Sequence, residues 1–139
     1  MRLLLAAAFL LAALAPAAAS ARGDLLAGHT IAGAGNVPLR RGWSVATAFV
    51  KIDFHAGPGH KLEFVDVGHG LHFRAVRFAS ATWGRRAVRF EGFGVADGRR
   101  VPFVATAIDG QAQDAFYVSW NHAAARGGPL RNGSITIGS

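Results

Sequence analysis

Short runs of alternating apolar and polar residues, separated by glycine-rich turns, fill the chain after residue 22. In one of them Leu62 and Phe64 share one parity while the charged Lys61 and Glu63 take the other, as in a strand with one buried face. Turn signals recur about every eight to twelve residues, which is typical of β-sandwiches and barrels. The predicted strands are Val45–Phe54, Lys61–Val67, Leu71–Ala81, Arg86–Val95, Arg99–Asp109, Asp114–Asn121 and Ser134–Gly138, with a further one within Leu25–Ile31.

One predicted strand changes parity along its length. Leu71 and Phe73 share one parity, whereas Val76 and Phe78 share the opposite one. A single extra residue near Arg74–Ala75 would return both pairs to the same face of the sheet, because side chains alternate with a period of two. The pattern therefore predicts a β-bulge at this point.

The turns between the predicted strands are short enough for hairpins. Asp97-Gly98 is the clearest turn signal, because both residue types tolerate a positive φ. Consecutive hairpins predict an all-β protein whose antiparallel meander of about seven or eight strands rolls into a barrel-like sheet, since an open meander leaves two exposed edges. A β-sandwich is the alternative. The glycine-rich segment Asn121–Gly133, which contains Pro129, is predicted to be a long loop.

The first segment has the pattern of a signal peptide. Arg2 supplies a positive start, Leu3–Ala15 is an unbroken apolar run, and Pro16 ends it. The run is shorter than the ~20 residues that span a bilayer. Small residues then offer cleavage after Ala21 or after Ala19. We expect residues 1–21 to be removed and the mature chain to be secreted or periplasmic, with no transmembrane segment.

Residues 22–139 have the length of one all-β domain. The chain has no cysteine, so its core has to rest on apolar packing without disulfides, and its ten phenylalanines suit that need. The side chains expected inside are Phe64, Phe73, Phe90, Phe103 and Phe116. The net charge of +7 has two explanations: the coding bias of a GC-rich bacterium, or affinity for polyanions.

Arginines gather at one end of the predicted meander. The turns at residues 68–70, 97–98 and 121–133 share what we call the first end, and the turns at 56–59, 83–84 and 110–113 share the second end. The predicted rim at the first end consists of Arg40, Arg41, Trp43, Arg99, Arg100, Arg126 and Arg131. Guanidinium groups bind sulfate, phosphate and carboxylate through paired hydrogen bonds, and Trp43 adds a ring for stacking. The alternative is a solvated face.

Six histidines do not converge on one point of this topology. His69 and His122 fall at the first end and His55 and His60 at the second, so a three-histidine zinc site is not expected. His55 and His60 flank one turn and are the remaining candidate metal pair, with solvated turn histidines as the alternative. We expect no cofactor.

The sequence has no Gly-x-Ser-x-Gly, no His-Glu-x-x-His and no cysteine nucleophile. Glu63 and Glu91 share parity with Lys61 and Arg89, which predicts that they face solvent and do not form the acid pair of a glycosidase. We therefore expect the protein not to be an enzyme.

Several motifs together resemble a known family. They are Ala46–Lys51, Leu62–Phe64, Gly70–Arg74, Gly92–Val95, Phe103–Gly110, Asp114–Val118 and Gly133–Ile137. In order and spacing this series resembles the post-choice-of-anchor domain of secreted bacterial proteins, over roughly Gly33–Gly138. The resemblance implies an exported all-β module, often an accessory segment of larger surface proteins, with no catalytic residues to carry over.

These observations lead to one expectation and two alternatives. We expect an exported, monomeric, non-enzymatic binding or accessory module at the bacterial cell envelope. Its expected partners are acidic polysaccharide or anionic lipid headgroups on the predicted rim, and no nucleic acid is expected. One alternative is a small β-barrel that carries an apolar ligand, which the number of inward phenylalanines disfavours. The other is a cell-wall or glycan hydrolase, which would need a coupled pair of buried carboxylates.

Overall fold

The computed structural model describes residues 25–41, 44–55 and 59–138, and of residues 39–41 and 44–46 it describes the backbone only. The predicted signal peptide, with its cleavage points at Ala19 or Ala21, lies outside the described residues, and so does Trp43. No helix in the described ranges is both long and apolar enough to cross a membrane.

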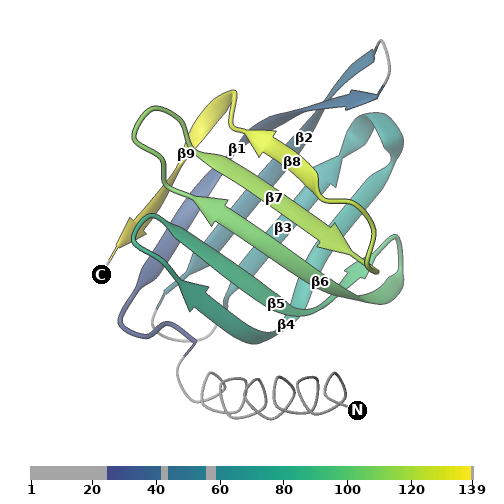
Figure 1. Cartoon of the computed structure of the whole chain (residues 1–139). Helices are drawn as coiled ribbons and strands as arrows, with labels where there is room; N and C mark the ends of the chain where they lie inside the picture. Colours follow the sequence, from purple (N-terminus) through teal and green to yellow (C-terminus); the bar gives the residue numbers. More distant parts are fainter. Residues whose placement is uncertain (1–24, 42–43, 56–58, 139) are drawn as a thin grey trace, which may run out of the picture.

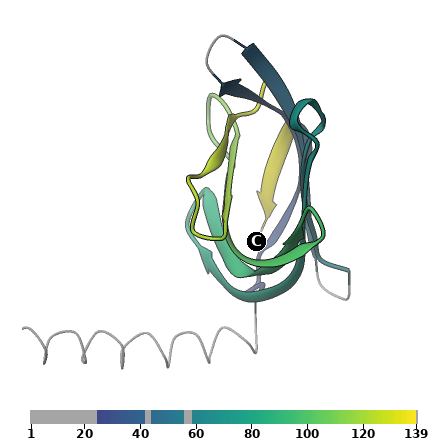
Figure 2. The same cartoon turned by 90° about the vertical axis from the view of Figure 1, so that its right-hand side faces the viewer.

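The described chain folds into nine strands and one short 3-10 helix, η1 (Val67–His69). The strands are β1 (Thr30–Arg41), β2 (Ser44–Phe54), β3 (Lys61–Asp66), β4 (Leu71–Trp83), β5 (Ala87–Ala96), β6 (Arg99–Ile108), β7 (Ala115–Trp120), β8 (Arg126–Pro129) and β9 (Asn132–Gly138). All pairings are antiparallel, in the order β8-β7-β6-β5-β4-β3-β2-β1-β9. In Figure 1, β5–β8 lie in front of β1–β3, and Figure 2 shows the sheet curving between the two layers.

The sheet is a curled half-barrel, and this confirms the predicted antiparallel meander over the alternative sandwich. The structure has nine strands, so the expected seven or eight is too few. The strands predicted from Val45–Phe54 onward correspond to β2–β7 and β9, with ends that agree within two residues. The prediction was wrong for β1, which occupies Thr30–Arg41, and for β8, which lies inside the predicted loop.

Glycines explain why β1 escaped the hydrophobic pattern. A Cβ on Gly33 would lie 2.5 Å from the carbonyl oxygen of Ser134, and one on Gly35 would lie 2.3 Å from that of Asn132. No real Cβ approaches a backbone oxygen so closely, so β1 and β9 need these glycines in order to pair. Where glycine is needed so that two backbones can approach closely, a strand has fewer of the β-branched residues that mark strands in a sequence.

The predicted β-bulge is present, one residue further along than the pattern placed it. The pairing of β4 with β5 shifts register between Ala75 and Arg77, so Val76 is the extra residue. Val76 is 63% exposed and so does not share the inward face of Phe78, as the parity argument had required. A second shift follows between Phe78 and Ser80. Together the shifts break the regular ladder of β4, the strand that links the two layers of the sheet.

Phenylalanine fills the concave side of the sheet. All five phenylalanines predicted to face inward are buried, at 0–3% exposure, and Phe54 joins them at 0%. Phe54 stacks on Phe90 at a centroid distance of 4.4 Å, toward the second end of the sheet. Toward the first end, Phe73 stacks on Trp120 at 5.2 Å with an interplanar angle of 6°. Burial of such rings contributes on the order of 1.5–3 kcal/mol each, so the phenylalanines supply apolar packing in a core that has no disulfides.

Carboxylates span the seam between the two edges of the half-barrel. Asp114 accepts a hydrogen bond from the backbone N–H of Ile135 in β9 at 2.7 Å, and Asp109 accepts one from Ile137 at 3.0 Å. Asp114 also holds its own turn, accepting from the N–H of Gly110 at 3.0 Å. Because β9 pairs only with β1 in the described sheet, these side chains satisfy N–H groups that an open edge would expose.

Candidate anion-binding surface

The turn that precedes the central arginines of the predicted rim has the expected geometry. Asp97 and Gly98 adopt φ values of +50° and +79°, which confirms the positive φ predicted for both. Asp97 also ties the turn to β4, since its backbone N–H donates to the carbonyl of His72 and its carboxylate accepts from the His72 N–H. Arg99 and Arg100 follow directly in β6, and both side chains are exposed at the first end.

Alternation sends these two arginines in different directions. Arg99 pairs with Ala96, which is 6% exposed, and therefore projects on the core side of the sheet at its open end. Arg100 pairs with Val95 and lies on the outer face, where its guanidinium carbon is 5.0 Å from the centre of the Phe93 ring. The predicted rim is thus divided between the open end of the half-barrel and its outer surface.

Arg126 joins Arg99 on the core side. It opens β8 opposite the fully buried Val118, and its guanidinium carbon lies 4.8 Å from the centre of the Trp120 ring. Trp120 in turn stacks on Phe73. Arg126 therefore closes the aromatic core at the first end through a cation–π contact, which makes it a structural residue as much as a surface charge.

The remaining members of the predicted rim do not join this group. Arg40 and Arg41 are the last residues of β1, in a hairpin that extends beyond the pairing of β1 with β9 and of β2 with β3 (Figure 1). Their side chains lie outside the described part, as does Trp43. The placement of Arg131 on the rim was wrong: the unpredicted strand β8 carries the chain back to the second end, beside the β6–β7 turn.

A second group of residues surrounds Arg100 on the outer face of the sheet. The assignment of turns to the two ends of the meander did not predict it. Arg74 in β4 pairs with Val95, which pairs on its other side with Arg100, so one outward row holds both arginines. Arg77 pairs with Phe93, one row further along. We call Arg74, Val76, Arg77, Phe93 and Arg100 the outer patch; Val76 and Phe93 are 63% and 40% exposed.

The spacing of the outer patch suits a single anionic group or two neighbouring ones. Adjacent strands lie about 4.8 Å apart, so the backbones of Arg74 and Arg100 are about 10 Å apart across Val95. Both arginine side chains are long enough to reach an anionic group that lies between these two positions. The bulge at Val76 was the available signal in the sequence, because it places Arg77 on the same face as Arg74 although an odd number of positions separates them.

Two hollows adjoin the outer patch, one on each side of the point where the β3–β4 ladder ends. The β3–β4 ladder ends at the pair Glu63 and Arg74, and these two residues line both hollows. One, of about 270 Å³, is also lined by His72, Val95, Asp97 and Gly98. The other, of about 360 Å³, is also lined by His60, Lys61, Leu62, Ala75 and Val76. We call the two hollows together the β3–β4 groove.

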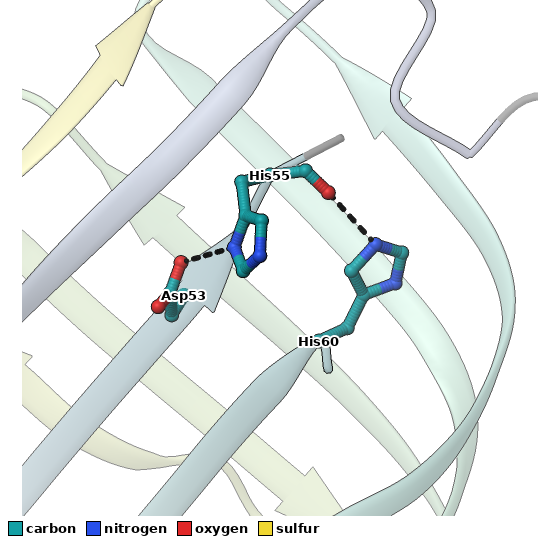
Figure 3. Close-up of polar contacts among 3 residues, drawn as sticks. All are labelled: Asp53, His55 and His60. Carbon is teal, nitrogen blue, oxygen red and sulfur yellow. Dashed lines mark hydrogen bonds and ion pairs between the residues drawn. The ribbon is translucent and has the colours of Figure 1, made fainter. Parts of the chain in front are cut away.

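His55 and His60, the candidate metal pair, each have a ring nitrogen close to another protein atom. The Nδ1 atom of His55 is 2.9 Å from a carboxylate oxygen of Asp53, and the Nε2 atom of His60 is 3.3 Å from the backbone oxygen of His55 (Figure 3). The His60 ring stacks on Phe54 at 4.3 Å, which makes it a lid on the core. Among the described residues, no group of three or more His, Cys, Asp or Glu side chains is arranged to hold a metal ion.

One carboxylate among the residues with a described side chain is fully buried. Asp66, at 0% exposure, accepts hydrogen bonds from the backbone N–H of His69 at 3.2 Å and contacts His69 Nδ1 at 2.7 Å. It caps the N-terminus of η1, which connects β3 to β4. Both oxygens are therefore engaged within one turn of chain, and Asp66 makes no ion pair with an arginine of the described residues.

The two glutamates weighed as a hydrolytic pair are far apart. Glu63 pairs with Arg74 on one side of β4, and Glu91 pairs with Ser80 on the other. Two strand spacings and about four residue steps separate them, on the order of 15 Å, whereas glycosidase carboxylates lie about 5–9.5 Å apart. Glu91 is also held by Arg89 at 2.9 Å. This pair therefore does not support a hydrolase.

Comparison of the chain with models of protein families, with curated proteins and with solved structures finds no match. The resemblance to the post-choice-of-anchor domain therefore stays a prediction. The function is therefore inferred from the chemistry of the outer patch and the β3–β4 groove.

Proposed function

We propose that the protein is an exported, non-enzymatic binding module that holds sulfate, phosphate or carboxylate groups at the cell envelope. The observation that carries the proposal is the outer patch, in which Arg74, Arg77 and Arg100 surround the exposed side chains of Phe93 and Val76. Acidic glycans and anionic lipid headgroups share this ligand chemistry. The proposal keeps the ligand class expected from the sequence and moves its main site from the rim to the outer face.

The physical argument combines charge with apolar contact. A hydrogen bond between a guanidinium and an oxyanion contributes about 1.5–3 kcal/mol, and arginine forms such bonds in pairs. Phe93 holds the Arg100 guanidinium at 5.0 Å, which lowers the entropy that this side chain loses when an anion binds. The exposed parts of Phe93 and Val76 offer an apolar surface to the carbon framework of the ligand.

The test is binding of dextran sulfate and of phosphatidylglycerol vesicles, with neutral dextran and phosphatidylcholine vesicles as controls. We expect at least one anionic probe to bind, with an affinity that falls steeply as salt rises. The variant Arg77→Glu/Arg100→Glu should reduce binding at least about tenfold. The matched control is Arg85→Glu/Arg86→Glu, which makes the same charge change in the exposed β4–β5 turn, away from the outer patch. Equal losses in the two variants would show net charge alone and would refute a defined site.

A further inference from the structure

The β3–β4 groove contains carboxylates as well as cations. Glu63 lines both hollows, and Asp97 lines the smaller one. Neither carboxylate is neutralised by a close arginine in the described structure: Glu63 lies 3.8 Å from His72 Nε2, and Asp97 accepts from a backbone N–H. The groove therefore places acceptors beside the donors of the outer patch, with Arg74 shared by both.

The presence of both carboxylates and cations in the groove distinguishes between the two ligand sources, acidic glycans and anionic lipid headgroups. A bilayer presents a dense layer of phosphates, and carboxylates that face such a layer repel it. A sugar chain instead carries many hydroxyl groups for each acidic group, and an ionised carboxylate is an acceptor for such hydroxyls. Glu63 and Asp97 next to Arg74 therefore match a ligand with hydroxyls at one point and an acidic group at the next.

The shape of the groove agrees with an elongated ligand. It begins beside Lys61 and Glu63 in β3, crosses β4 and ends at the Asp97-Gly98 turn. Two strand spacings and about four residue steps separate Lys61 from Asp97, on the order of 16 Å, which is enough for a short oligosaccharide. Phe93 lies in the row next to Val95, a lining residue of the groove. Its exposed face can pack against the C–H side of a pyranose ring and bury apolar area.

We propose that the preferred ligand is an acidic oligosaccharide of the uronic-acid class, bound along the β3–β4 groove with its carboxylates on Arg74 and Arg100. The carboxylate of Glu63 accepts hydrogen bonds from hydroxyl groups of the same chain. Lys61 donates to the sugar at the far end of the groove. This inference rests on the proposed function and chooses between its two ligand sources.

The decisive variant is Glu63→Gln, because the two ligand sources predict opposite results. Removal of this negative charge next to Arg74 strengthens purely electrostatic attraction, so binding of phosphatidylglycerol vesicles should stay equal or increase. Binding of tetragalacturonate should instead weaken by about threefold to tenfold, because a neutral amide is a poorer acceptor for hydroxyls. Isothermal titration calorimetry and vesicle sedimentation measure the two. Glu91→Gln, which removes an outward carboxylate outside the groove, is the matched control and should change neither by more than about twofold.

The outcomes separate this inference from the proposed function. If the parent protein binds the vesicles but not tetragalacturonate, or if Glu63→Gln strengthens both, the oligosaccharide inference is wrong while anion binding stands. If tetragalacturonate methyl ester binds as well as the acid, the carboxylates play no part and the assignment to Arg74 and Arg100 is overturned. If no anionic probe binds the parent protein, both proposals fail.

Discussion

Removal of the Asp114 carboxylate should open the seam of the half-barrel. Its two oxygens accept from Gly110 at 3.0 Å and from Ile135 at 2.7 Å, so Asp114→Ala deletes both bonds at once. Hydrogen bonds to a charged group contribute about 1.5–3 kcal/mol each. The site is only part-buried, and water can replace part of what is lost, so we expect a total cost of about 2–4 kcal/mol.

The cost translates into a large thermal shift. With an unfolding entropy of about 2.1 cal/mol/K per residue, a domain of about 118 residues has about 0.25 kcal/mol/K, and a loss of about 3 kcal/mol lowers Tm by about 12 °C. Urea unfolding at an unchanged m-value is the equilibrium measurement. Hydrogen exchange provides the local readout, because the N–H of Ile135 should lose protection before the rest of β9.

Two further variants make the reasoning about the seam refutable. Asp114→Asn keeps one acceptor oxygen and should cost about half as much as Asp114→Ala. Gln111→Ala changes an exposed side chain in the same turn and should be nearly neutral. If Asp114→Ala destabilises no more than Gln111→Ala, or if the exchange of Ile135 is unchanged, the Asp114 carboxylate does not hold β9, and the bond from Ile137 to Asp109 and apolar packing close the seam.

Three other changes test the fold. Gly35→Ala should cost at least about 2 kcal/mol in urea unfolding, because the new Cβ would lie 2.3 Å from a backbone oxygen of β9; a neutral result would contradict the tight pairing. Phe73→Ala should cost about 3–5 kcal/mol and reduce the near-ultraviolet circular dichroism of Trp120, and an unchanged spectrum would argue against the stacked pair. Deletion of Val76 removes only the unpaired residue and leaves Arg77 opposite Phe93 on the outer face, so the fold should persist by far-ultraviolet circular dichroism and dextran sulfate binding should fall by no more than the apolar contact of Val76 contributes; unfolding would show that the bulge is required for the sheet.

The sheet could be predicted from the sequence wherever one face of a strand is buried. The pattern around Phe64, Phe90 and Phe116 alternates because these side chains are inside, and the corresponding strands were found to within two residues. In β1 and β8 the pattern carries no such signal. Gly127 and Gly128 supply half of β8, and a Cβ on Gly127 would lie 2.0 Å from the Phe116 carbonyl oxygen. Strands that need glycine for close contact between backbones do not show the alternation of apolar and polar residues by which strands are predicted.

The candidate site was predicted less well than the fold because it depends on lateral neighbours. Counting turns assigns a residue to an end of the sheet, and this was correct for Arg99, Arg100 and Arg126. It failed for Arg131, because a strand that the sequence does not reveal reverses the chain before that residue. No count along the chain shows that Arg74 lies beside Val95, since cross-strand neighbours follow from register and not from sequence distance.

The bulge at Val76 connects the fold to the proposed ligand site. If Val76 were paired like its neighbours, Arg74 and Arg77 would project from opposite faces of β4, and only one of them could lie on the outer surface. With the bulge, both share that surface and Val76 itself is turned outward, next to the point where β3 and β4 separate. The same distortion that lets the sheet bend thus supplies a basic, partly apolar and concave surface. A ladder in which Val76 were paired would turn Arg77 toward the core side, so the outer patch depends on this irregularity in β4.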